Sequence, residues 1–221
     1  MNRARRSAAV ERLFPSGVIA FEFGGVASPS DLLPSERECV AHAVEKRVRE
    51  FAAGRLTARA ALVALGHEPV PLLIGPDRMP AWPAGVVGSI THTDGYCVAV
   101  VGSATQFAAI GVDAECVEAM SPSLWPLTLH AEEFASLKNL DEAARLQMTT
   151  IIFSAKEAFY KCQYPLTRRW IGFEEVTVKV ADNTFELSMV EETHPVRSVS
   201  SPWVGRFMFG EALYGDRKSV V

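Results

Sequence analysis

The chain has 221 residues, of which 48% are hydrophobic and 22% charged, with 15 glycines and 13 prolines. This composition excludes an intrinsically disordered chain and a fibrous protein, and the length suffices for a sizeable core in one or two domains. The formal net charge of −4 disfavours a protein that binds nucleic acid by bulk electrostatic attraction. The charge is unevenly distributed, since residues 1–60 carry ten basic and seven acidic side chains, whereas residues 111–142 carry one basic and seven acidic.

No targeting feature is visible in the sequence. The basic start of the chain has no apolar segment behind it, which argues against a secretory signal, and no apolar run approaches the 18 residues of a membrane-spanning helix. The four cysteines lie far apart and form no C-x-x-C pair, so neither a disulfide framework nor a zinc site is expected. We therefore expect a cytoplasmic protein with no membrane partner and no nucleic-acid partner.

The first half of the chain predicts a strand, a long helix and an irregular loop. Apolar residues over 17–23 predict the strand. The helix is expected to begin at Ser35, which with Glu38 has the spacing of a capping box, and to continue to about Leu65. Five prolines between residues 69 and 85 predict the loop.

Strand and helix patterns alternate through the rest of the chain. Short apolar or alternating segments predict five strands, over residues 96–101, 107–115, 176–180, 185–189 and 203–209. A long helix is expected from Asp141 to about Gln163, where Pro165 would stop it. Residues 102–106 form either a hairpin turn or the seam between two halves. The order of the elements indicates an α+β fold with two lobes of about 100 residues each.

Two acidic residues at the end of the strand expected over 107–115 form the first chemical signal. Side chains alternate along a strand, so Asp113 and Glu115 would project from one face about 7 Å apart. Mg²⁺ suits such a pair, because it prefers oxygen ligands and needs only one or two carboxylates beside substrate phosphates. An exposed strand end would explain the same two residues without a metal.

The second signal lies on the helix expected over 141–163, where Glu157 and Lys161 are four residues apart and share a face. An ordinary surface ion pair would have the same spacing. Apolar residues surround this pair, at Ile151, Ile152, Phe153, Phe159 and Tyr160. A largely buried helix that carries both charges is less ordinary, because unpaired charge in an apolar environment costs free energy.

Two further segments carry groups that suit phosphate. Thr91 and His92 offer a hydroxyl and an imidazole at the start of a strand, although a purely structural histidine is the alternative. Arg47 and Arg55 lie on the first long helix, where their guanidinium groups would either grip phosphate oxygens or face solvent. The glycine-containing stretch before His92 is neither a P-loop nor a nucleophile elbow, because it lacks G-x-x-x-x-G-K-[ST] and G-x-S-x-G.

Together these segments closely resemble the 4′-phosphopantetheinyl transferases of the long, monomeric kind, whose best-known members activate surfactin and enterobactin synthetases. Three motifs carry the resemblance in a fixed order: Trp82-Pro83-x-Gly85 with Gly88-Ser89-Ile90-Thr91-His92, then Gly111-Val112-Asp113-Ala114-Glu115, then Phe153-Ser154-x-Lys156-Glu157-Ala158-x-x-Lys161. The segments 47–55 and 165–170 are similar to the enterobactin-type subgroup. The resemblance runs from about residue 45 to residue 175.

The resemblance implies an enzyme that transfers the 4′-phosphopantetheine arm of coenzyme A to a serine of an apo acyl or peptidyl carrier protein and releases adenosine 3′,5′-bisphosphate. It implies two similar-sized, pseudo-symmetric α+β lobes, residues 1–105 and 106–221, with the active site at their junction in a monomer. Coenzyme A would be the co-substrate. Mg²⁺, or Mn²⁺ in its place, would be held on the pyrophosphate by Asp113, Glu115 and Glu157.

The resemblance also implies roles for basic and polar residues. The coenzyme A phosphates would be bound by Arg47, Arg55, Arg78, Thr91 and His92. Lys161 would neutralise charge that builds on the bridging and α-phosphate oxygens, and Lys156 would either contact phosphate or support Glu157. The proton of the attacking serine would pass to Glu157 or Glu133, directly or through a water.

Two rival functions use the same residues. A Mg²⁺-dependent phosphohydrolase acting on nucleotides or coenzyme A would use the acids without a protein acceptor. A non-enzymatic coenzyme A-binding module would keep its role after loss of Asp113. Only the transferase raises the mass of an apo carrier protein by one phosphopantetheine arm, so that measurement separates the three functions.

Overall fold

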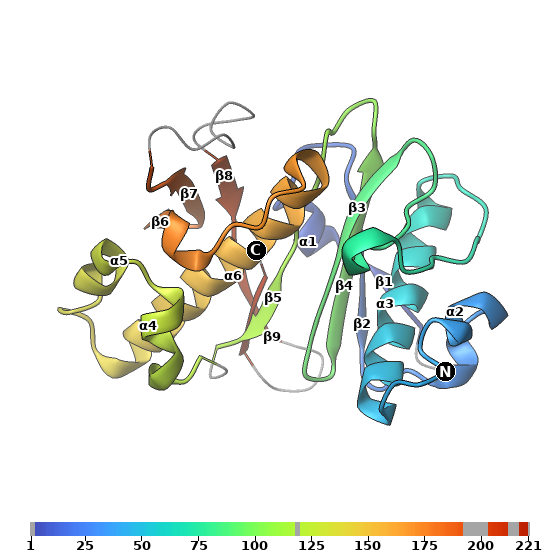
Figure 1. The fold of residues 1–221 in the computed structure, drawn as a ribbon, viewed down its shortest axis with the longest axis horizontal. Helices are drawn as coiled ribbons and strands as arrows, with labels where there is room; N and C mark the ends of the chain where they lie inside the picture. Colours follow the sequence, from blue (N-terminus) through green and yellow to red (C-terminus); the bar gives the residue numbers. More distant parts are fainter. Residues whose placement is uncertain (1–2, 118–119, 192–202, 212–216, 221) are drawn as a thin grey trace.

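The chain folds into two α+β halves that lie side by side (Figure 1). The structure is a computed structural model, and it describes residues 3–117, 120–191, 203–211 and 217–220. The strands in these residues form one four-stranded and two three-stranded antiparallel sheets, and the α+β class is confirmed. Across the same ranges, no helix combines the length and the apolar character that a membrane crossing requires.

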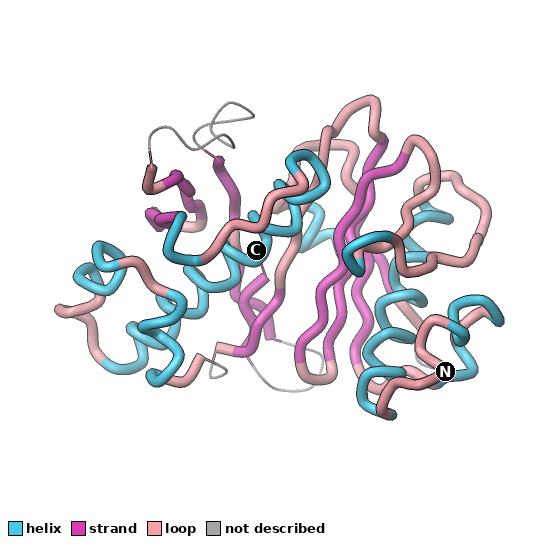
Figure 2. Tube along the Cα trace, viewed as in Figure 1, coloured by secondary structure: helices cyan, strands magenta, loops and turns pink. Residues whose placement is uncertain are grey.

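The first half is built on the four-stranded sheet, whose strands lie in the order β1-β2-β4-β3. Its elements are β1 (Arg5–Arg6), α1 (Ala8–Glu11), β2 (Ile19–Gly24), η1 (Pro29–Asp31), α2 (Pro34–Glu38), α3 (Glu45–Ala64), η2 (Pro76–Arg78), β3 (Val86–Thr93) and β4 (Tyr96–Ser103). Helix α3 packs along β4 and β2, and Figure 2 shows it beside the strands of this half. Its buried face is rich in alanine, which lets the helix approach the sheet closely.

The helix expected over 35–65 is two helices, α2 and α3, with residues 39–44 between them. The capping box also differs from the prediction. Pro34 occupies the first helical position, which makes Leu33 the N-cap, and the Glu36 carboxylate accepts the Leu33 backbone N–H at 2.9 Å. The N-cap therefore lies two residues before the predicted Ser35, and the capping glutamate is Glu36 and not Glu38.

No strand is predicted over residues 86–93, where the structure has β3. Thr91 and His92, which the sequence places at the start of a strand, lie near the end of this one. A glycine in mid-strand weakens the sequence pattern, but Gly88 is required by packing, because a Cβ there would lie 2.8 Å from the Trp82 ring. The turn between β3 and β4 contains Gly95, with φ of +63°. The hairpin of this region thus lies earlier in the chain than expected.

The second half is organised around a long helix and two small sheets, with strand orders β5-β10-β9 and β6-β7-β8. Its elements are β5 (Ala114–Cys116), η3 (Pro122–Leu124), α4 (Trp125–Thr128), α5 (Ala131–Ser136), α6 (Glu142–Thr167), η4 (Phe173–Glu175), β6 (Val176–Ala181), β7 (Thr184–Met189), β8 (Trp203–Arg206), β9 (Met208–Glu211) and β10 (Arg217–Val220). The core of this half packs α6 against β6 and β7 through Ile152, Phe159 and Leu187. The hairpin expected over 176–189 is confirmed.

Two strand boundaries in the second half differ from the predictions. The strand expected over 107–115 is confined to β5, because the chain before it crosses a helix and joins no sheet. The strand expected over 203–209 is divided at Phe207, with β8 and β9 in different sheets. Residues 102 and 103 belong to β4, and residues 104–106 form a turn after it; β4 and β5 belong to different sheets, so this turn does not join a hairpin between them.

Helix α6 begins where the sequence predicts and ends later. The Asp141 carboxylate caps it by accepting the Ala144 backbone N–H at 2.8 Å. Pro165 lies inside the last turn, where a proline removes one hydrogen bond of the helix, and the helix continues to Thr167. Arg168 then takes a left-handed conformation and closes the helix end.

The connection between the halves presses against α6 at Gly111. A Cβ at this position would overlap the carbonyl oxygen of Ala158 and lie 2.9 Å from the Cβ of Cys162. Only glycine lets the linker backbone approach the helix so closely. This contact fixes the residues that follow Gly111 at the junction of the two halves.

Candidate active site

The carboxylate of Asp113 lies at the junction and is 3% exposed. On its Oδ1, it accepts hydrogen bonds from Thr91 Oγ1 of β3, at 2.9 Å, and from Lys161 Nζ of α6, at 2.6 Å. On its Oδ2, it accepts a hydrogen bond from Ser154 Oγ of α6, at 2.8 Å. Both halves of the chain therefore bind one buried carboxylate, whose countercharge is Lys161.

Lys161 is the member of this group that faces solvent. Its side chain is 27% exposed, and its ammonium also lies 3.2 Å from Thr91 Oγ1 and 3.3 Å from the Val112 carbonyl oxygen. The direct ion pair of Lys161 is with Asp113, not with Glu157 four residues earlier on the helix. The ion pair expected within the helix is thus replaced by one between Lys161 of α6 and Asp113 of the preceding linker.

Glu157 is partly buried and forms no hydrogen bond or ion pair within the described residues. Burial raises the pKa of its carboxyl; Lys161 lowers that pKa and Asp113 raises it. Asp113 and Lys161 therefore lie within electrostatic range of Glu157, and carboxylate oxygens are the ligands that Mg²⁺ prefers. Asp113 and Glu157 therefore fit a magnesium site.

Glu115 lies on β5 and faces Ser219 of β10 in the strand register. Asp113 lies just before β5. The strand alternation expected to place Asp113 and Glu115 on one face therefore does not include Asp113. Across the described ranges, no three His, Cys, Asp or Glu side chains lie close enough to hold a metal ion. Asp113, Glu115 and Glu157 therefore do not form a compact cluster among the described residues.

His92, Arg47 and Glu50 form a second polar group, between β3 and α3. His92 Nε2 lies 3.5 Å from Arg47 Nη1 and 3.9 Å from Glu50 Oε2. Burial lowers the pKa of His92; Glu50 raises it and Arg47 lowers it. Lys161 lowers this pKa and Asp113 raises it as well, so His92 lies within electrostatic range of the Asp113 carboxylate.

Arg55, expected to grip phosphate, is 6% exposed and bound to the protein itself. Its guanidinium donates to the carbonyl oxygens of Leu72, at 2.6 Å, and Leu73, at 3.5 Å, and lies over the Phe51 ring. Burial lowers its pKa to about 10. In this structure Arg55 braces the loop after α3, whereas Arg78, in the same loop, is exposed.

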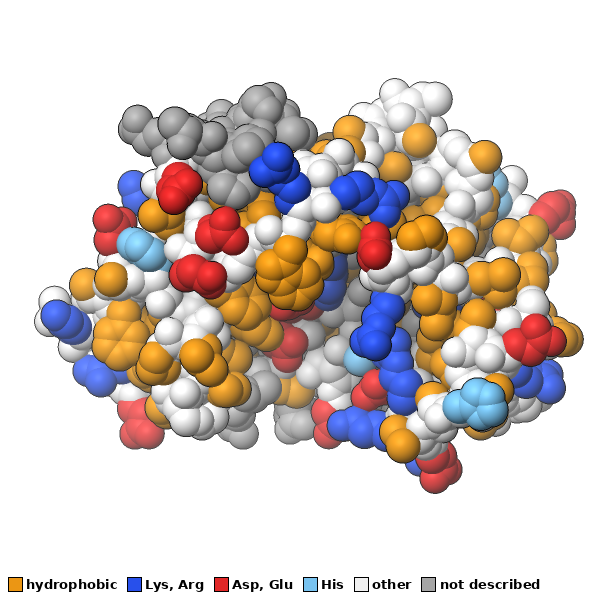
Figure 3. Space-filling view, viewed as in Figure 1, with side chains coloured by type: hydrophobic (Ala, Val, Ile, Leu, Met, Phe, Trp, Pro, Cys, Tyr) orange, Lys and Arg blue, Asp and Glu red, His pale blue; other side chains and the backbone are white. Residues whose placement is uncertain are grey.

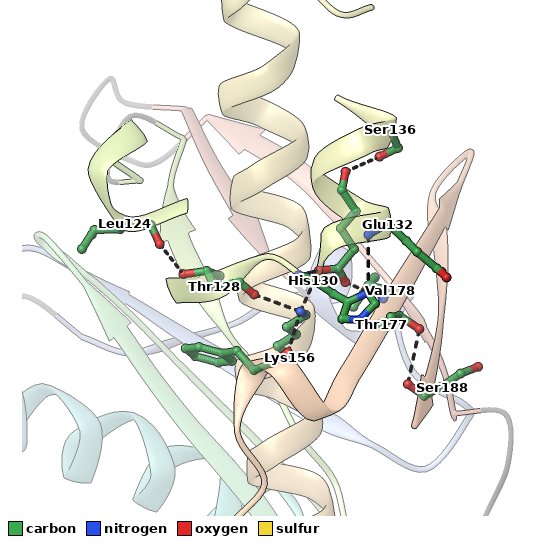
Figure 4. Close-up of polar contacts among 11 residues, drawn as sticks. Leu124, Thr128, His130, Glu132, Ser136, Lys156, Thr177, Val178 and Ser188 are labelled. Carbon is green, nitrogen blue, oxygen red and sulfur yellow. Dashed lines mark hydrogen bonds and ion pairs between the residues drawn. The ribbon is translucent and has the colours of Figure 1, made fainter. Parts of the chain in front are cut away.

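Lys156 and Glu133 form a separate buried ion pair, shown with its neighbours in Figure 4. Lys156 is 1% exposed, and its ammonium donates to Glu133 Oε2 at 2.7 Å and to the carbonyl oxygens of Thr128 and Phe173, each at 2.9 Å. These three acceptors use all three donors of the ammonium. Lys156 has no donor left for a phosphate and instead ties α4, α5 and η4 to the turn of α6 that carries Glu157.

The Glu133 carboxylate is occupied in the same way. Its Oε2 also accepts the His130 backbone N–H at 2.7 Å, and its Oε1 accepts the Val178 backbone N–H at 2.6 Å. Together with the bond from Lys156, its two oxygens accept three hydrogen bonds within a buried structural network. The geometry does not support the expectation that Glu133 is the general base or that Lys156 contacts phosphate, because both side chains are saturated away from Asp113.

A cleft of about 350 Å³ lies between the halves, lined by residues 77–82, β3 and the Lys161 region of α6. A hollow of about 330 Å³ is lined by Glu157 and Trp170, and another of about 710 Å³ by His92 and the first turns of α3. Figure 3 shows basic side chains along the hollow between the halves, on the side of the first half. Candidate residues thus line three separate hollows: Lys161 and Arg78 line the cleft, Glu157 the second hollow and His92 the third.

Two hydroxyl groups at the site have no role among the sequence predictions. Ser154 donates to Asp113, and Ser89 Oγ accepts the backbone N–H of Val112 at 3.2 Å. Both lie inside the motifs, but serine also serves caps and small packing sites, so the residue type alone does not mark them. Their meaning depends on contacts between residues far apart in the sequence.

Comparison with family models matches both halves of the chain. Residues 35–102 match the N-terminal domain of 4′-phosphopantetheinyl transferases, and residues 109–207 match the 4′-phosphopantetheinyl transferase superfamily. The two matches leave residues 103–108 between them.

Individual relatives agree with these models. The chain is 40% identical over 179 residues to the 4′-phosphopantetheinyl transferase Npt of Nocardia iowensis, and the aligned region covers 79% of each chain. It is 39% identical over 176 residues to PptT of Mycobacterium tuberculosis, which covers 80% of this chain and 70% of the relative. It is 37% identical over 122 residues to enterobactin synthase component D of Escherichia coli K12, which covers 54% of this chain and 56% of the relative.

Proposed function

The chain belongs to the 4′-phosphopantetheinyl transferases and has their activity; from this premise we propose that it transfers the phosphopantetheine arm of coenzyme A to a serine of an apo acyl or peptidyl carrier protein. The observation that supports the site best is the buried Asp113 carboxylate, bonded by Thr91 of the first half and by Lys161 and Ser154 of the second. Asp113 is a buried acid, and its partner Lys161 is partly exposed and lines the cleft. This arrangement suits a metal-assisted reaction of a pyrophosphate.

Magnesium is the cation proposed for this site. Asp113 and Glu157 would hold it, with Glu115 as a third ligand, and the ion would neutralise the pyrophosphate and orient it for in-line attack. The support is the donor set itself: two carboxylates, one of which has a raised pKa and no partner within the described part of the chain. Manganese has similar ligand preferences and would substitute.

The remaining residues of the site would bind and neutralise the ligand. Arg47 and His92 would contact phosphate groups beside β3, and Arg78 would do so at the edge of the cleft. Thr91 would orient Lys161, whose ammonium would stabilise the charge that develops on the bridging oxygen when its bond to the transferred phosphorus breaks. Adenosine 3′,5′-bisphosphate is the leaving product of this step.

The serine hydroxyl that attacks must lose its proton. Of the two acidic candidates, Glu157 has oxygens free of hydrogen bonds in the described structure, whereas those of Glu133 are used. Glu157, directly or through a water, is therefore the proposed acceptor. Burial of its carboxyl raises its affinity for a proton, as a general base requires.

We also propose that the division of the chain falls at residues 105 and 106 and that the protein acts as a monomer. The donors to Asp113 come from both sides of this boundary in one chain, so the site needs no second copy.

The mass of a panel of apo carrier proteins, measured after incubation with the protein, coenzyme A and Mg²⁺, tests the proposal. Transfer adds one phosphopantetheine arm to the carrier serine, and Asp113→Ala should abolish the addition. Release of products from coenzyme A without a mass change in any carrier would instead identify a phosphohydrolase. Binding of coenzyme A with neither reaction would identify a binding module.

A further inference from the structure

We infer that Ser154 is a positioning residue that holds the Asp113 carboxylate in the orientation needed for the cation. This inference rests on the proposed function, in which Asp113 is a metal ligand. The Ser154 hydroxyl lies 2.8 Å from Asp113 Oδ2 and is its only hydrogen-bond donor among the described side chains. The other two side-chain donors to this carboxylate both bind Oδ1.

The two oxygens of Asp113 therefore have different surroundings. Oδ1 lies beside Lys161, which lines the cleft and is partly exposed. Oδ2 lies beside Ser154, which is fully buried. An ammonium on a flexible side chain can leave Oδ1 for a phosphate oxygen, whereas a buried serine on a helix cannot follow it.

The backbone around Ser154 fixes its position further. Ala158, one turn later on α6, is the residue whose carbonyl oxygen meets the linker at Gly111. On the linker side, Ser89 Oγ accepts the Val112 backbone N–H, next to Asp113. The linker is thus held against α6 at Gly111 and against β3 at Val112, directly before Asp113. What remains free is rotation of the Asp113 carboxylate, which the Ser154 bond restricts.

Ligands that are held by a second hydrogen bond bind metal more tightly, because their orientation is set before the metal arrives. Loss of the Ser154 hydroxyl should leave the charge of Asp113 unchanged and free its carboxylate to rotate. The expected consequence is a weaker cation site with the chemistry of the saturated enzyme preserved.

The test compares Ser154→Ala with Ser154→Thr, which keeps the hydroxyl, and with Thr150→Ala. Thr150 is the matched control: it is buried one turn earlier on α6, and its hydroxyl lies within hydrogen-bond distance of two carbonyl oxygens, of Leu146 at 2.9 Å and of Val117 at 3.0 Å, and of no carboxylate among the described residues. The first measurement is the Mg²⁺ concentration that gives half-maximal transfer. The second is Mn²⁺ binding in the presence of coenzyme A, followed by the electron paramagnetic resonance of free Mn²⁺.

Ser154→Ala should raise both metal concentrations about 10-fold, while the rate at saturating Mg²⁺ stays within about threefold of the wild type. Ser154→Thr should restore most of the affinity, and Thr150→Ala should leave the metal dependence unchanged. An unchanged metal dependence in Ser154→Ala, or an equal shift in Thr150→Ala, would overturn the inference.

Two further outcomes are separated by the design. If Ser154→Ala does not fold, Ser154→Cys, which preserves volume and donates only weakly, should give an intermediate shift, and no shift would count against the inference. If the wild type modifies no carrier, the proposed function fails, while the Mn²⁺ measurement still decides the role of Ser154.

Discussion

Lys156 Nζ lies 2.7 Å from Glu133 Oε2 at a point where both side chains are almost completely removed from solvent. Each is saturated by backbone groups from α4, α5, η4 and β6. This pair joins the small helices of the second half to α6, one residue before Glu157. A charge pair of this kind costs desolvation free energy, so its effect appears most clearly when only one partner is removed.

Lys156→Met should lower the free energy of unfolding by about 3–5 kcal/mol, because it leaves the Glu133 carboxylate buried without its countercharge. Lys156→Met combined with Glu133→Gln should recover part of this loss, since the amide oxygen still accepts one backbone N–H and carries no charge. Urea unfolding measures both. A double variant that is less stable than the single one would contradict the structural role.

Glu133→Gln separates that role from catalysis. If Glu133 were the general base, the rate of transfer at saturating substrates would fall about 10²–10⁴-fold in a folded protein. We expect a loss of less than about 10-fold, with the effect confined to stability. The comparison is made on protein that circular dichroism shows to be folded, and a large loss of kcat in such protein would restore Glu133 as the base.

Lys161→Met should affect both stability and activity, because Lys161 is the countercharge of Asp113 at 2.6 Å. We expect a loss of about 2–3 kcal/mol in unfolding free energy and a 10²–10³-fold loss of transfer rate. Adding Asp113→Asn should recover stability by removing the uncompensated charge, without recovering any transfer. Recovery of activity in the double variant would show that neither residue acts in the reaction.

Glu157→Gln should make the metal-free protein more stable at pH 7 while reducing transfer about 10²–10³-fold. Since burial raises the pKa of Glu157 in the folded state, the folded protein binds the proton more tightly than the unfolded chain. Stability contributed by this group is therefore present at low pH and is lost as the pH rises from the ordinary value of 4.5 through the raised one.

Thermal unfolding across this pH range checks the prediction. The melting temperature of Glu157→Gln should exceed that of the wild type at pH 7, and the difference should shrink as the pH falls towards 4.5. A variant that melts below the wild type at pH 7 would mean that Glu157 has a stabilising partner in the free protein.

Thr149→Val should preserve activity and increase stability by up to about 1 kcal/mol. The Thr149 hydroxyl is fully buried on α6 and has no hydrogen-bond partner among the residues that the structure describes. An unsatisfied buried polar group costs free energy that an apolar group of the same shape does not. Chemical denaturation gives the stability change. A clear loss of stability would show that the hydroxyl is satisfied in solution.

The fold class, the second-half hairpin and the Asp141 cap were accessible to sequence reasoning because each depends on local patterns. Strand β3 was not, because Gly88 is there for the Trp82 ring, a contact that periodicity does not record. The start of the first helix depends on Pro34 and on the carboxylate of Glu36, which also accepts the Leu72 backbone N–H from a distant loop.

The site divides in the same way. Sequence spacing identified Asp113, Glu157 and Lys161 as residues with chemistry to perform, and the structure brings Asp113 and Lys161 into direct contact. Spacing could not distinguish Lys156 from Lys161, five residues apart on one helix, because only tertiary packing decides which ammonium is buried against Glu133 and which lines the cleft. For Arg55 the residue type suggested an anion, but burial gave it backbone carbonyls instead.

The close contact of Gly111 with α6 has a consequence for the order in which the molecule assembles. Asp113 is synthesised before Ser154 and Lys161, so its carboxylate cannot be buried at acceptable cost until α6 has formed and docked on the linker. Docking of α6 is then the step that joins the halves and completes the site at once. A bulkier residue at position 111 would force the linker away from α6 and separate the Asp113 carboxylate from Ser154 and Lys161.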